Sequence, residues 1–368
     1  MSSDQSAKPS SHSAPLPRPA HRPGRAFVTT VRTRKVRSHE TVADYLLSEQ
    51  QLEDMYYHMV LARRLNERML VLNRQGRAPF VIAGAGQEAA QVGAAMALTK
   101  GVDYVAPYYR DLGVNLVLGM TPREAMLNLL GKRDDPNGHG RQMPAHWGNT
   151  ARKVVTQSSV VTTQFLHATG IGLAAKLRKD PIVVLTSCGE GSTAKGDFHE
   201  ALNFAAIHKL PVIFFVENNG YAISESNEKE MPVPHVADRA LGYGLRGQVV
   251  DGMDGIAVYQ TVKPAVDQAR RGGGPFLIEA KCYRLWPHSS DDDDSRYRPK
   301  SELEEWAKKD PIKVFRERVE SDHIFPPEDL DEIEKRVAEE VREAAQWALM
   351  QPDPEPEDAL GFVYTELD

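Results

Sequence analysis

The sequence PIVVLTSC (Pro181–Cys188) is followed by GSTAKGDFHEALNFAAIHK (Gly191–Lys209) and then by PVIFFV (Pro211–Val216). The first and last of these runs are short and apolar, and each begins with a proline, a residue that breaks regular structure. This pattern is typical of buried strands. The middle segment has apolar residues at helical spacing: Phe198, Ala201, Leu202, Ala205 and Ala206. A strand, a helix and a strand in this order predict a βαβ unit and hence a parallel sheet.

The flanking segments extend this unit. Gln248–Val250 and Pro275–Ala280 are two further predicted strands, separated by a predicted helix over Ala257–Arg270. The region 100–285 is therefore predicted to be an α/β domain with a doubly wound parallel sheet and helices on both faces. Helices are also expected over Ser48–Gly76, Gly84–Leu98, Thr121–Leu130 and Ser159–Leu177, and over most of Ser301–Ala348.

One loop and the two chain ends do not follow this pattern. Residues 131–147 form a long loop rich in Gly, Pro, Asp and His, and loops of this length inside a domain are usually functional. Residues 1–40 hold eight Lys or Arg and two Asp or Glu, with many Pro and Ser, and are expected to be a flexible arm. Gln351–Asp358 is expected to be a stiff linker, followed by a short apolar segment, Leu360–Tyr364, that docks.

Composition excludes several classes of protein. The chain has 368 residues, a formal net charge of −6 and two cysteines. It contains no apolar run of membrane-spanning length, which excludes an integral membrane helix. Two cysteines exclude a disulfide scaffold and a four-thiolate metal site and fit a reducing compartment. The negative charge argues against a general nucleic-acid-binding protein.

Polar residues follow both strands of the central unit. Glu190 lies just after the first strand, and Asn219 and Tyr221 lie just after the second. The carboxyl ends of neighbouring parallel strands meet at one edge of a sheet, where α/β folds bind ligands. A carboxylate, an amide oxygen and a backbone carbonyl, here that of Tyr221, are suitable ligands for Mg²⁺.

Backbone features at the same edge favour an anion beside the metal. Gly189 and Gly191 flank Glu190 and allow the backbone to approach a bulky ligand. A helix that begins at Gly191 would direct its free N–H groups and the positive end of its dipole to the same point. The pattern therefore predicts a site for a metal and a diphosphate.

The stretch GEGSTAKGDFHEALNFAAIHKLPVIFFVENNGYAIS (Gly189–Ser224) resembles the α subunit of the decarboxylating, thiamine diphosphate-dependent component of 2-oxo acid dehydrogenase complexes. The resemblance extends from about residue 50 to the C-terminus. It includes, in order, PFVIAGAGQEAAQVGAAMAL, YYRDLGV, GRQMPAHWG, SSVVTTQ, GYGLRGQVVDGMD and HSSDDDD. GRQMPAHWG together with SSVVTTQ looks most like the branched-chain 2-oxo acid members. The resemblance implies thiamine diphosphate and Mg²⁺ as cofactors, and K⁺ as a third.

The resemblance also implies roles for individual residues. The Mg²⁺ ligands would be Glu190, Asn219 and the carbonyl of Tyr221. Residues in contact with the cofactor would be Tyr109, Arg110, Ser159, Val161, Gly189, Glu190, Gly191, Ser192, Asn219 and His288. A K⁺ loop would comprise Ser158, Val160, Thr163 and Gln164. The substrate pocket would comprise Phe80, Tyr109, Met143 and His146, and the residues at the reacting centre His288 and His146.

Four positions depart from the family pattern or carry a special expectation. Glu217 stands where some relatives have an arginine that reaches the diphosphate. Val160 replaces a frequent proline in the cation loop, and Pro287 replaces a second histidine. Ser289 matches a position that is phosphorylated in some organelle relatives, and a phosphate there would repel the diphosphate.

The resemblance implies partners as well. The cofactor also needs a carboxylate against its aminopyrimidine, normally from a second parallel α/β domain, and this sequence offers one such domain. We therefore expect a β subunit and an α₂β₂ heterotetramer. The lipoyl domain of the dihydrolipoyl acyltransferase core would accept the acyl group, and no nucleic acid or membrane is expected as a partner. The expected location is the bacterial cytoplasm, with the mitochondrial matrix as the alternative.

The predicted organisation is an arm over residues 1–40, a thiamine diphosphate-binding α/β domain over 41–300 and a helical extension and tail over 301–368. Other functions stay open at this point. One is the pyruvate-specific α subunit, and another is an inactive paralogue that binds partners. A third is a NAD-dependent oxidoreductase, because Gly84–Ala89 is a glycine-rich loop before a predicted helix. Gly242–Gly247 has the same glycine spacing but follows a helix and precedes a strand, so we interpret it as a turn.

Overall fold

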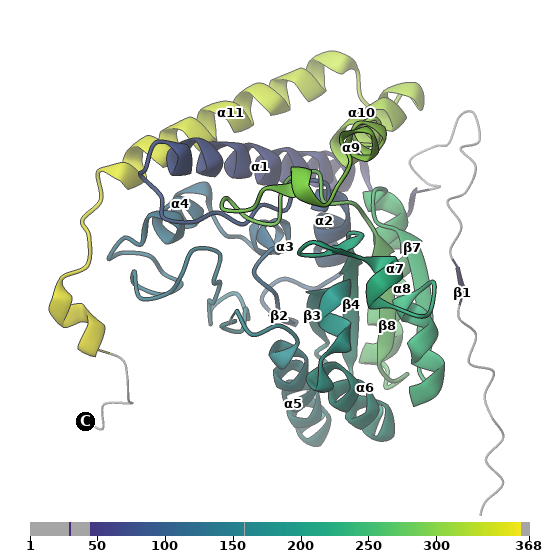
Figure 1. The fold of residues 1–368 in the computed structure, drawn as a ribbon. Coiled ribbons are helices and arrows are strands. Elements are labelled where there is room, and N and C mark those ends of the chain that lie inside the picture. Colours follow the sequence, from purple (N-terminus) through teal and green to yellow (C-terminus); the bar gives the residue numbers. More distant parts are fainter. Residues whose placement is uncertain (1–28, 31–44, 158, 362–368) are drawn as a thin grey trace, which may run out of the picture.

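The computed structural model describes residues 29–30, 45–157 and 159–361 (Figure 1). In this part of the chain six strands form one sheet in the order β1-β7-β8-β4-β3-β2, and every neighbouring pair is parallel. The strands are β1 (Thr29–Thr30), β2 (Tyr104–Ala106), β3 (Val184–Gly189), β4 (Val212–Asn218), β7 (Arg246–Asp251) and β8 (Phe276–Lys281). A separate antiparallel hairpin joins β5 (Tyr221–Ala222) to β6 (Glu225–Ser226). The predicted parallel sheet is confirmed.

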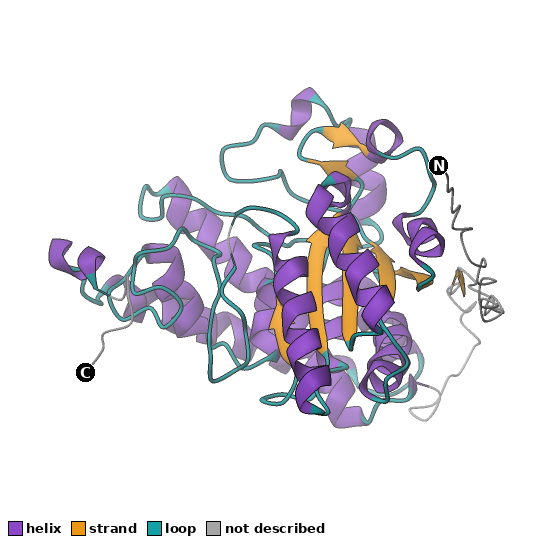
Figure 2. Ribbon diagram, turned by 90° about the horizontal axis from the view of Figure 1, so that it is seen from below, coloured by secondary structure: helices purple, strands orange, loops and turns teal. Residues whose placement is uncertain are grey.

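Helices cover the sheet and extend beyond it (Figure 2). The α-helices are α1 (Glu49–Arg74), α2 (Glu88–Met96), α3 (Leu112–Val117), α4 (Pro122–Leu130), α5 (Thr163–Arg178), α6 (Gly196–His208), α7 (Asn227–Glu230), α8 (Gly255–Arg270), α9 (Lys300–Ala307), α10 (Pro311–Ser321) and α11 (Pro327–Leu349). The 3₁₀ turns are η2 (Glu190–Ala194), η3 (Val236–Tyr243), η4 (Asp294–Arg296) and η5 (Pro356–Leu360).

Two hydrophobic cores lie on opposite faces of the sheet, because alternate residues of a strand point to opposite faces. Phe214 of β4 packs in one core with Phe165 of α5 and Phe198 of α6. Its neighbour Phe215 packs in the other core, which includes residues of α1, α2 and α8. All seven residues of β4 are buried, as expected for a central strand of a parallel sheet covered on both faces. This architecture places the carboxyl ends of β3 and β4 side by side.

The helix expected to begin at Gly191 begins instead at Gly196, and this part of the prediction is wrong. Residues 190–194 form the 3₁₀ turn η2, and Lys195 is extended between the turn and α6. Glycine at 191 and 196 disfavours a continuous helix. The Thr193 hydroxyl also donates to the Glu190 carbonyl at 2.6 Å, an alternative to helical bonding that Ser and Thr side chains commonly provide.

Two other helices also begin later in the chain than predicted. The second helix begins at Glu88 rather than Gly84, and α5 begins at Thr163 rather than Ser159. The N-terminus of α4 is as predicted, since Thr121 and Glu124 form a capping box with Pro122 in the first turn. The short elements β2 and α3 escaped the sequence analysis because they are too brief to show a periodic pattern.

The C-terminal helices pack onto the α/β domain. Helix α11 lies along α1 (Figure 1), with the hydroxyls of Tyr56 and Tyr57 donating to Glu334 and Glu340 at 2.7 and 2.6 Å. Apolar residues of α10 and α11 share the core that contains α1. The arm over residues 1–40 lies outside the described residues, apart from the two residues of β1, and most of the expected docking tail lies outside them too. Among the described helices, none has the length and apolar character needed to cross a membrane.

Candidate functional site

A cavity of about 500 Å³ opens at the carboxyl ends of β3 and β4. It is lined by most of the residues that the sequence predicted for cofactor and substrate: Phe80, Tyr109, Arg110, Met143, Ser159, Val161, Gly189, Glu190, Gly191, Ser192, Asn219, Tyr221 and His288. These residues come from seven separate segments of the chain. The fold therefore brings them to one place, as expected for a ligand site at this edge of an α/β sheet.

Glu190 has one carboxylate oxygen available for a ligand. Its side chain is 1% exposed, and its Oε2 accepts a hydrogen bond from the Asn219 backbone N–H at 3.0 Å. Its Oε1 is buried without a hydrogen-bond partner among the described residues. Burial raises the pKa of this carboxyl, and a nearby cation would favour its ionised form. A buried carboxylate oxygen without a partner fits a metal ligand.

Asn219 and Tyr221 supply the other oxygens near Glu190. The Asn219 side chain donates to Gln87 Oε1 at 3.3 Å, and its Oδ1 accepts from the Tyr221 N–H at 3.3 Å, which orients the amide oxygen toward the β5 hairpin. In the described part of the chain, no three His, Cys, Asp or Glu side chains form a metal cluster. A metal here would rely on one carboxylate plus amide and carbonyl oxygens, a donor set that suits Mg²⁺ rather than a transition metal.

Gly191 makes room for the loop that follows β4. A Cβ added at this residue would lie 2.3 Å from the Cβ of Ala222, so only glycine fits beside the β5 hairpin. This packing holds η2 and the hairpin together on either side of the cavity. The glycine is therefore required by a close approach within the protein, in addition to any approach to a ligand.

Two buried arginines give the cavity an excess of positive charge. Arg110 is 2% exposed and Arg284 is 1% exposed, and both line the cavity. Among the described residues neither forms an ion pair with a carboxylate, and the Nε atom of each is buried without a partner. Arg110 donates instead to the Ala83 carbonyl at 2.6 Å, and Arg284 to the Ile223 carbonyl at 2.8 Å. Because neither buried guanidinium has a carboxylate in direct contact, the cavity favours an anionic ligand.

Sequence reasoning did not find Arg284. It follows β8, which neighbours β4 in the sheet, so it lies at the same edge as Glu190 and Asn219. A search of the residues after every predicted strand would have indicated it. Lys195, Tyr108 and Glu230 also line the cavity and were not predicted.

His288 lies between the two arginines. Its Nδ1 is 3.3 Å from Arg110 Nη2 and 3.4 Å from Arg284 Nη1. Because guanidinium groups only donate, Nδ1 acts as the acceptor and the ring proton lies on Nε2. Burial, together with the charges of Arg110 and Arg284, lowers the pKa of His288 to about 4. The imidazole is therefore neutral near pH 7 in the cofactor-free chain.

This pKa predicts a pH dependence of stability. The pKa of His288 is about 4 in the folded chain and about 6.5 in the unfolded chain, so between these values only the unfolded state binds the proton. The free energy of unfolding should therefore fall as the pH falls from about 6.5 to 4, by up to about 2 kcal/mol. Chemical unfolding of the cofactor-free chain at several pH values measures this, and His288→Asn should reduce the slope. Asn at the exposed His167 is the control, and an equal reduction by both variants would contradict the assignment.

Three predicted substrate-pocket residues line the cavity, and His146 does not. Phe80, Tyr109 and Met143 contribute to its wall. His146 is 6% exposed, and its Nε2 lies 2.7 Å from the hydroxyl of Ser159, which does line the cavity. His146 thus lies one hydrogen bond behind the cavity wall. Its role at the reacting centre stays a prediction, with Ser159 as the connecting group.

The predicted K⁺ loop is partly described. Ser158 lies outside the described residues, and Val160 is 54% exposed. The Thr163 hydroxyl donates to Asp197 at 3.0 Å, and the Gln164 amide donates to the Ser187 carbonyl at 2.8 Å. The Gln164 amide oxygen therefore points away from Ser187. A cation at this loop stays a prediction.

Glu217 points away from the cavity and into the interior. Both Glu217 and Asp111 are fully buried and hydrogen-bonded to each other, and burial together with Asp111 raises the pKa of Glu217 well above its usual value. Gln91 donates to Glu217 Oε2 at 3.0 Å, and the Tyr108 hydroxyl lies 3.3 Å from the same oxygen. The two carboxyls therefore share a proton. Glu217 does not replace the diphosphate-binding arginine of some relatives.

This shared proton predicts a contrast between two buried glutamates. Glu217→Gln keeps an N–H donor where the protonated carboxyl has its O–H, so we expect the free energy of unfolding to change by less than about 1 kcal/mol. Glu279 pairs instead with Lys281 at 2.6 Å and accepts from Ala237 N–H at 2.9 Å. Glu279→Gln should cost about 2 kcal/mol because it removes the charge of a buried carboxylate that pairs with the partly exposed Lys281. Denaturant unfolding of both variants measures the difference, and the opposite ranking would contradict a protonated Glu217.

Another segment of the chain packs closely against the glycine-rich loop at Gly84–Ala89. A Cβ at Gly86 would lie 2.0 Å from the Tyr283 carbonyl, and Leu285 N–H donates to the Ala85 carbonyl at 3.0 Å. Gly86 has φ +92°, which favours glycine. The loop therefore packs against residues 283–285, and its glycines need no dinucleotide to explain them.

Comparison with known proteins points to one family. Residues 56–357 match the family model described as dehydrogenase E1 component. The chain is 50% identical to 2-oxoisovalerate dehydrogenase subunit alpha of Bacillus subtilis (strain 168) over 324 residues, which are 87% of this chain and 97% of that protein. It is 38% identical to 3-methyl-2-oxobutanoate dehydrogenase subunit alpha of Mycobacterium tuberculosis (strain ATCC 25618 / H37Rv) over 87% of this chain and 84% of that one. It is also 38% identical to pyruvate dehydrogenase E1 component subunit alpha of Staphylococcus aureus (strain N315) over 81% of this chain and 78% of that one.

Proposed function

We propose, from the premise that this chain belongs to the dehydrogenase E1 component family, that it is the α subunit of a branched-chain 2-oxo acid dehydrogenase. The observation that carries this proposal is that three groups lie together in one cavity. They are a carboxylate oxygen of Glu190 without a hydrogen-bond partner and two buried arginines that form no ion pair with a carboxylate among the described residues. The branched-chain substrate is supported by the 50% identity to a 2-oxoisovalerate dehydrogenase subunit over nearly its whole length.

The residues present fit thiamine diphosphate with Mg²⁺. Glu190 Oε1, the Asn219 amide oxygen and the Tyr221 carbonyl would hold the metal, and Arg110 and Arg284 would bind the diphosphate. Tyr109, Ser159, Val161, Gly189, Gly191, Ser192 and His288 complete the proposed cofactor contacts. The loop of Ser158, Val160, Thr163 and Gln164 would hold K⁺. The cation would stabilise this loop and so fix the positions of Ser159 and Val161.

The residues of this chain would bind, orient and move protons. When bound, thiamine diphosphate would supply a carbanionic nucleophile and an electron sink for decarboxylation of the 2-oxo acid. Arg110 and Arg284 would bind the diphosphate, whose negative charge would raise the pKa of His288 from about 4 toward its ordinary range. His288 can then hold or release a proton on Nε2 at the substrate oxygen. Phe80 and Met143 would provide apolar surface for the branched side chain, and His146 would act through Ser159, which also lines the cavity.

This chain would form half of the complete site. The cavity holds metal and diphosphate ligands, and a β subunit in an α₂β₂ assembly would provide the groups for the rest of the cofactor. The acyl acceptor would be the lipoyl domain of the dihydrolipoyl acyltransferase core. The bacterial relatives support a cytoplasmic location. The proposed organisation stays an α/β domain over residues 41–300 with a helical extension over 301–368.

Substrate preference tests the proposal. We expect the enzyme assembled with its β subunit, assayed with an artificial electron acceptor, to have a kcat/KM for 3-methyl-2-oxobutanoate at least about tenfold above that for pyruvate. The measurement is the initial rate over a range of each acid at saturating thiamine diphosphate and Mg²⁺. A preference for pyruvate would keep the site and overturn the branched-chain assignment.

A further inference from the structure

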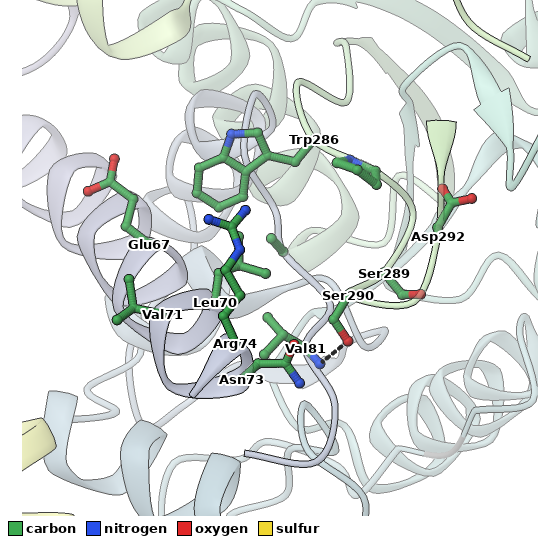
Figure 3. A pocket seen from close by; sticks show the side chains of 12 residues that line it. Glu67, Leu70, Val71, Asn73, Arg74, Val81, Trp286, Ser289, Ser290 and Asp292 are labelled. Carbon is green, nitrogen blue, oxygen red and sulfur yellow. Dashed lines mark hydrogen bonds between the residues drawn. The ribbon is translucent and has the colours of Figure 1, made fainter. Parts of the chain in front are cut away.

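A second cavity, of about 490 Å³, lies on the other side of the loop that carries His288 (Figure 3). One wall is the last turns of α1, with Leu70 and Arg74. The opposite wall is the segment from Trp286 to Ser290. The volume lies within the usual range for small-molecule sites. None of the residues predicted for cofactor, metal or substrate lines this second cavity.

A wall one backbone thick separates the two cavities. Along residues 80–83, Phe80 and Ile82 line the cofactor cavity, whereas Val81 and Ala83 line the second cavity. In the opposite segment, His288 lines the first cavity and its neighbour Ser289 lines the second.

Two hydrogen bonds hold this wall together. Ser290 N–H donates to the Val81 carbonyl at 2.8 Å. Val81 N–H donates to the Ser290 hydroxyl at 3.2 Å, the bond drawn in Figure 3. The wall also carries the His288 backbone, whose N–H donates to Asp292 at 2.7 Å. A ligand in the second cavity would therefore press on the segment that positions His288.

The polar groups at the Arg74 end of the second cavity favour an anion. Arg74 is exposed and extends from α1 toward the Trp286 indole (Figure 3), and among the described residues neither Arg74 nor the indole N–H has a hydrogen-bond or ion-pair partner. The lining also holds two carboxylates: Glu67 pairs with Arg64 at 3.0 Å, and Asp292 accepts from the His288 N–H and from the Tyr297 hydroxyl. A cation in the last turn of a helix is also favoured by the helix dipole. The dipole does not explain why this arginine is directed across a cavity.

The rest of the lining is apolar. Leu70, Val81 and Pro287 form a surface next to the Arg74 and Trp286 donors. Val81 is 2% exposed, and Val71 at the rim is 40% exposed. An apolar floor beside one unpaired cation matches a ligand with a charged end and an apolar body.

We propose that this cavity is a second binding site, for a small amphipathic organic anion with a carboxylate or sulfonate joined to an aliphatic or aromatic body. The anionic group binds Arg74 and the Trp286 N–H, and the body packs on Leu70, Val81 and Pro287. Because the wall is shared, occupation of this site changes turnover at the cofactor site. By linkage, cofactor binding changes the affinity for the anion by the same factor as the anion changes the affinity for the cofactor.

The test uses 8-anilinonaphthalene-1-sulfonate, an amphipathic anion whose fluorescence rises in apolar sites, with the heterotetramer saturated with thiamine diphosphate and Mg²⁺. We expect Arg74→Gln to weaken the saturable binding about tenfold, as the loss of one charge-assisted contact predicts. Arg77→Gln, at an exposed arginine just beyond the end of α1 and outside the lining, is the matched control and should change binding less than twofold. N-phenyl-1-naphthylamine, the same body without the sulfonate, should not distinguish wild type from Arg74→Gln. Val71→Trp, which places a bulky ring at the rim, should also weaken the binding of the sulfonate.

Two results would overturn the proposal. Equal affinity of wild type and Arg74→Gln for the sulfonate would show that the anion does not bind in this cavity. Unchanged kcat and KM for the 2-oxo acid at a saturating sulfonate concentration would overturn the coupling through the wall. Either result leaves the proposed function intact, because basal turnover of the variants is measured separately and is expected to equal that of wild type.

Discussion

Glu190→Gln is expected to weaken the binding of thiamine diphosphate in the presence of Mg²⁺ by at least about 100-fold, and to lower turnover in proportion. Glutamine keeps an oxygen to accept the Asn219 N–H bond, but it replaces the free anionic oxygen with a neutral group. The metal then loses its one carboxylate ligand from this chain. Calorimetric titration of the cofactor into the metal-loaded heterotetramer measures the change.

A matched control keeps this result specific. Glu230 lines the same cavity and has no role in the proposed metal site, so Glu230→Gln should leave the affinity within about threefold of wild type. Since Glu190 is buried, thermal unfolding of the variant should be compared with wild type. Full cofactor affinity in a folded Glu190→Gln enzyme would refute the assignment of Glu190 as a metal ligand.

Arg110→Gln is the second substitution with a large expected effect. Arg110 is 2% exposed and has no carboxylate partner among the described residues, so its charge is available for the diphosphate. Loss of one partner of a buried charge pair costs about 2–5 kcal/mol, which corresponds to a loss of cofactor affinity of about 30-fold or more. The concentration of thiamine diphosphate that gives half-maximal turnover measures the loss.

Lysine at the same position separates charge from geometry. Arg110→Lys keeps the charge but loses the fork that contacts the Ala83 and His288 carbonyls, so we expect an intermediate affinity. Arg152→Gln, which removes an arginine paired with Glu124 at 2.7 Å outside the cavity, should leave the half-maximal concentration unchanged. If Arg110→Gln behaved like Arg152→Gln, the diphosphate would have to bind elsewhere.

The sequence predicted the centre of the fold well because its signals are local. The strands within PIVVLTSC and PVIFFV are buried on both faces, so their apolar runs predict them directly. Glu190 and Asn219 follow directly from these strands, so the same pattern that predicts the βαβ unit also brings the two residues together. The resemblance then added Tyr109, Arg110 and His288, which come from other segments and line the same cavity.

The features that were missed depend on tertiary packing. The turn at Glu190–Ala194 replaces the first turn of the expected helix because two glycines and a threonine hydroxyl compete with helical bonding. Arg284 has no motif of its own, and its importance arises from its burial beside Arg110. Glu217 was compared with an arginine of some relatives, yet its proton-sharing contact with Asp111 becomes visible only once the interior is known.

The central claim is that this chain forms the metal and diphosphate half of a thiamine diphosphate site that a β subunit completes. The most direct measurement is the rate of 3-methyl-2-oxobutanoate decarboxylation by this chain alone, by its β partner alone and by the two together, each with and without thiamine diphosphate and Mg²⁺. We expect turnover only when both chains and both cofactors are present. Full turnover by this chain alone, or turnover by the mixture without thiamine diphosphate, would contradict it.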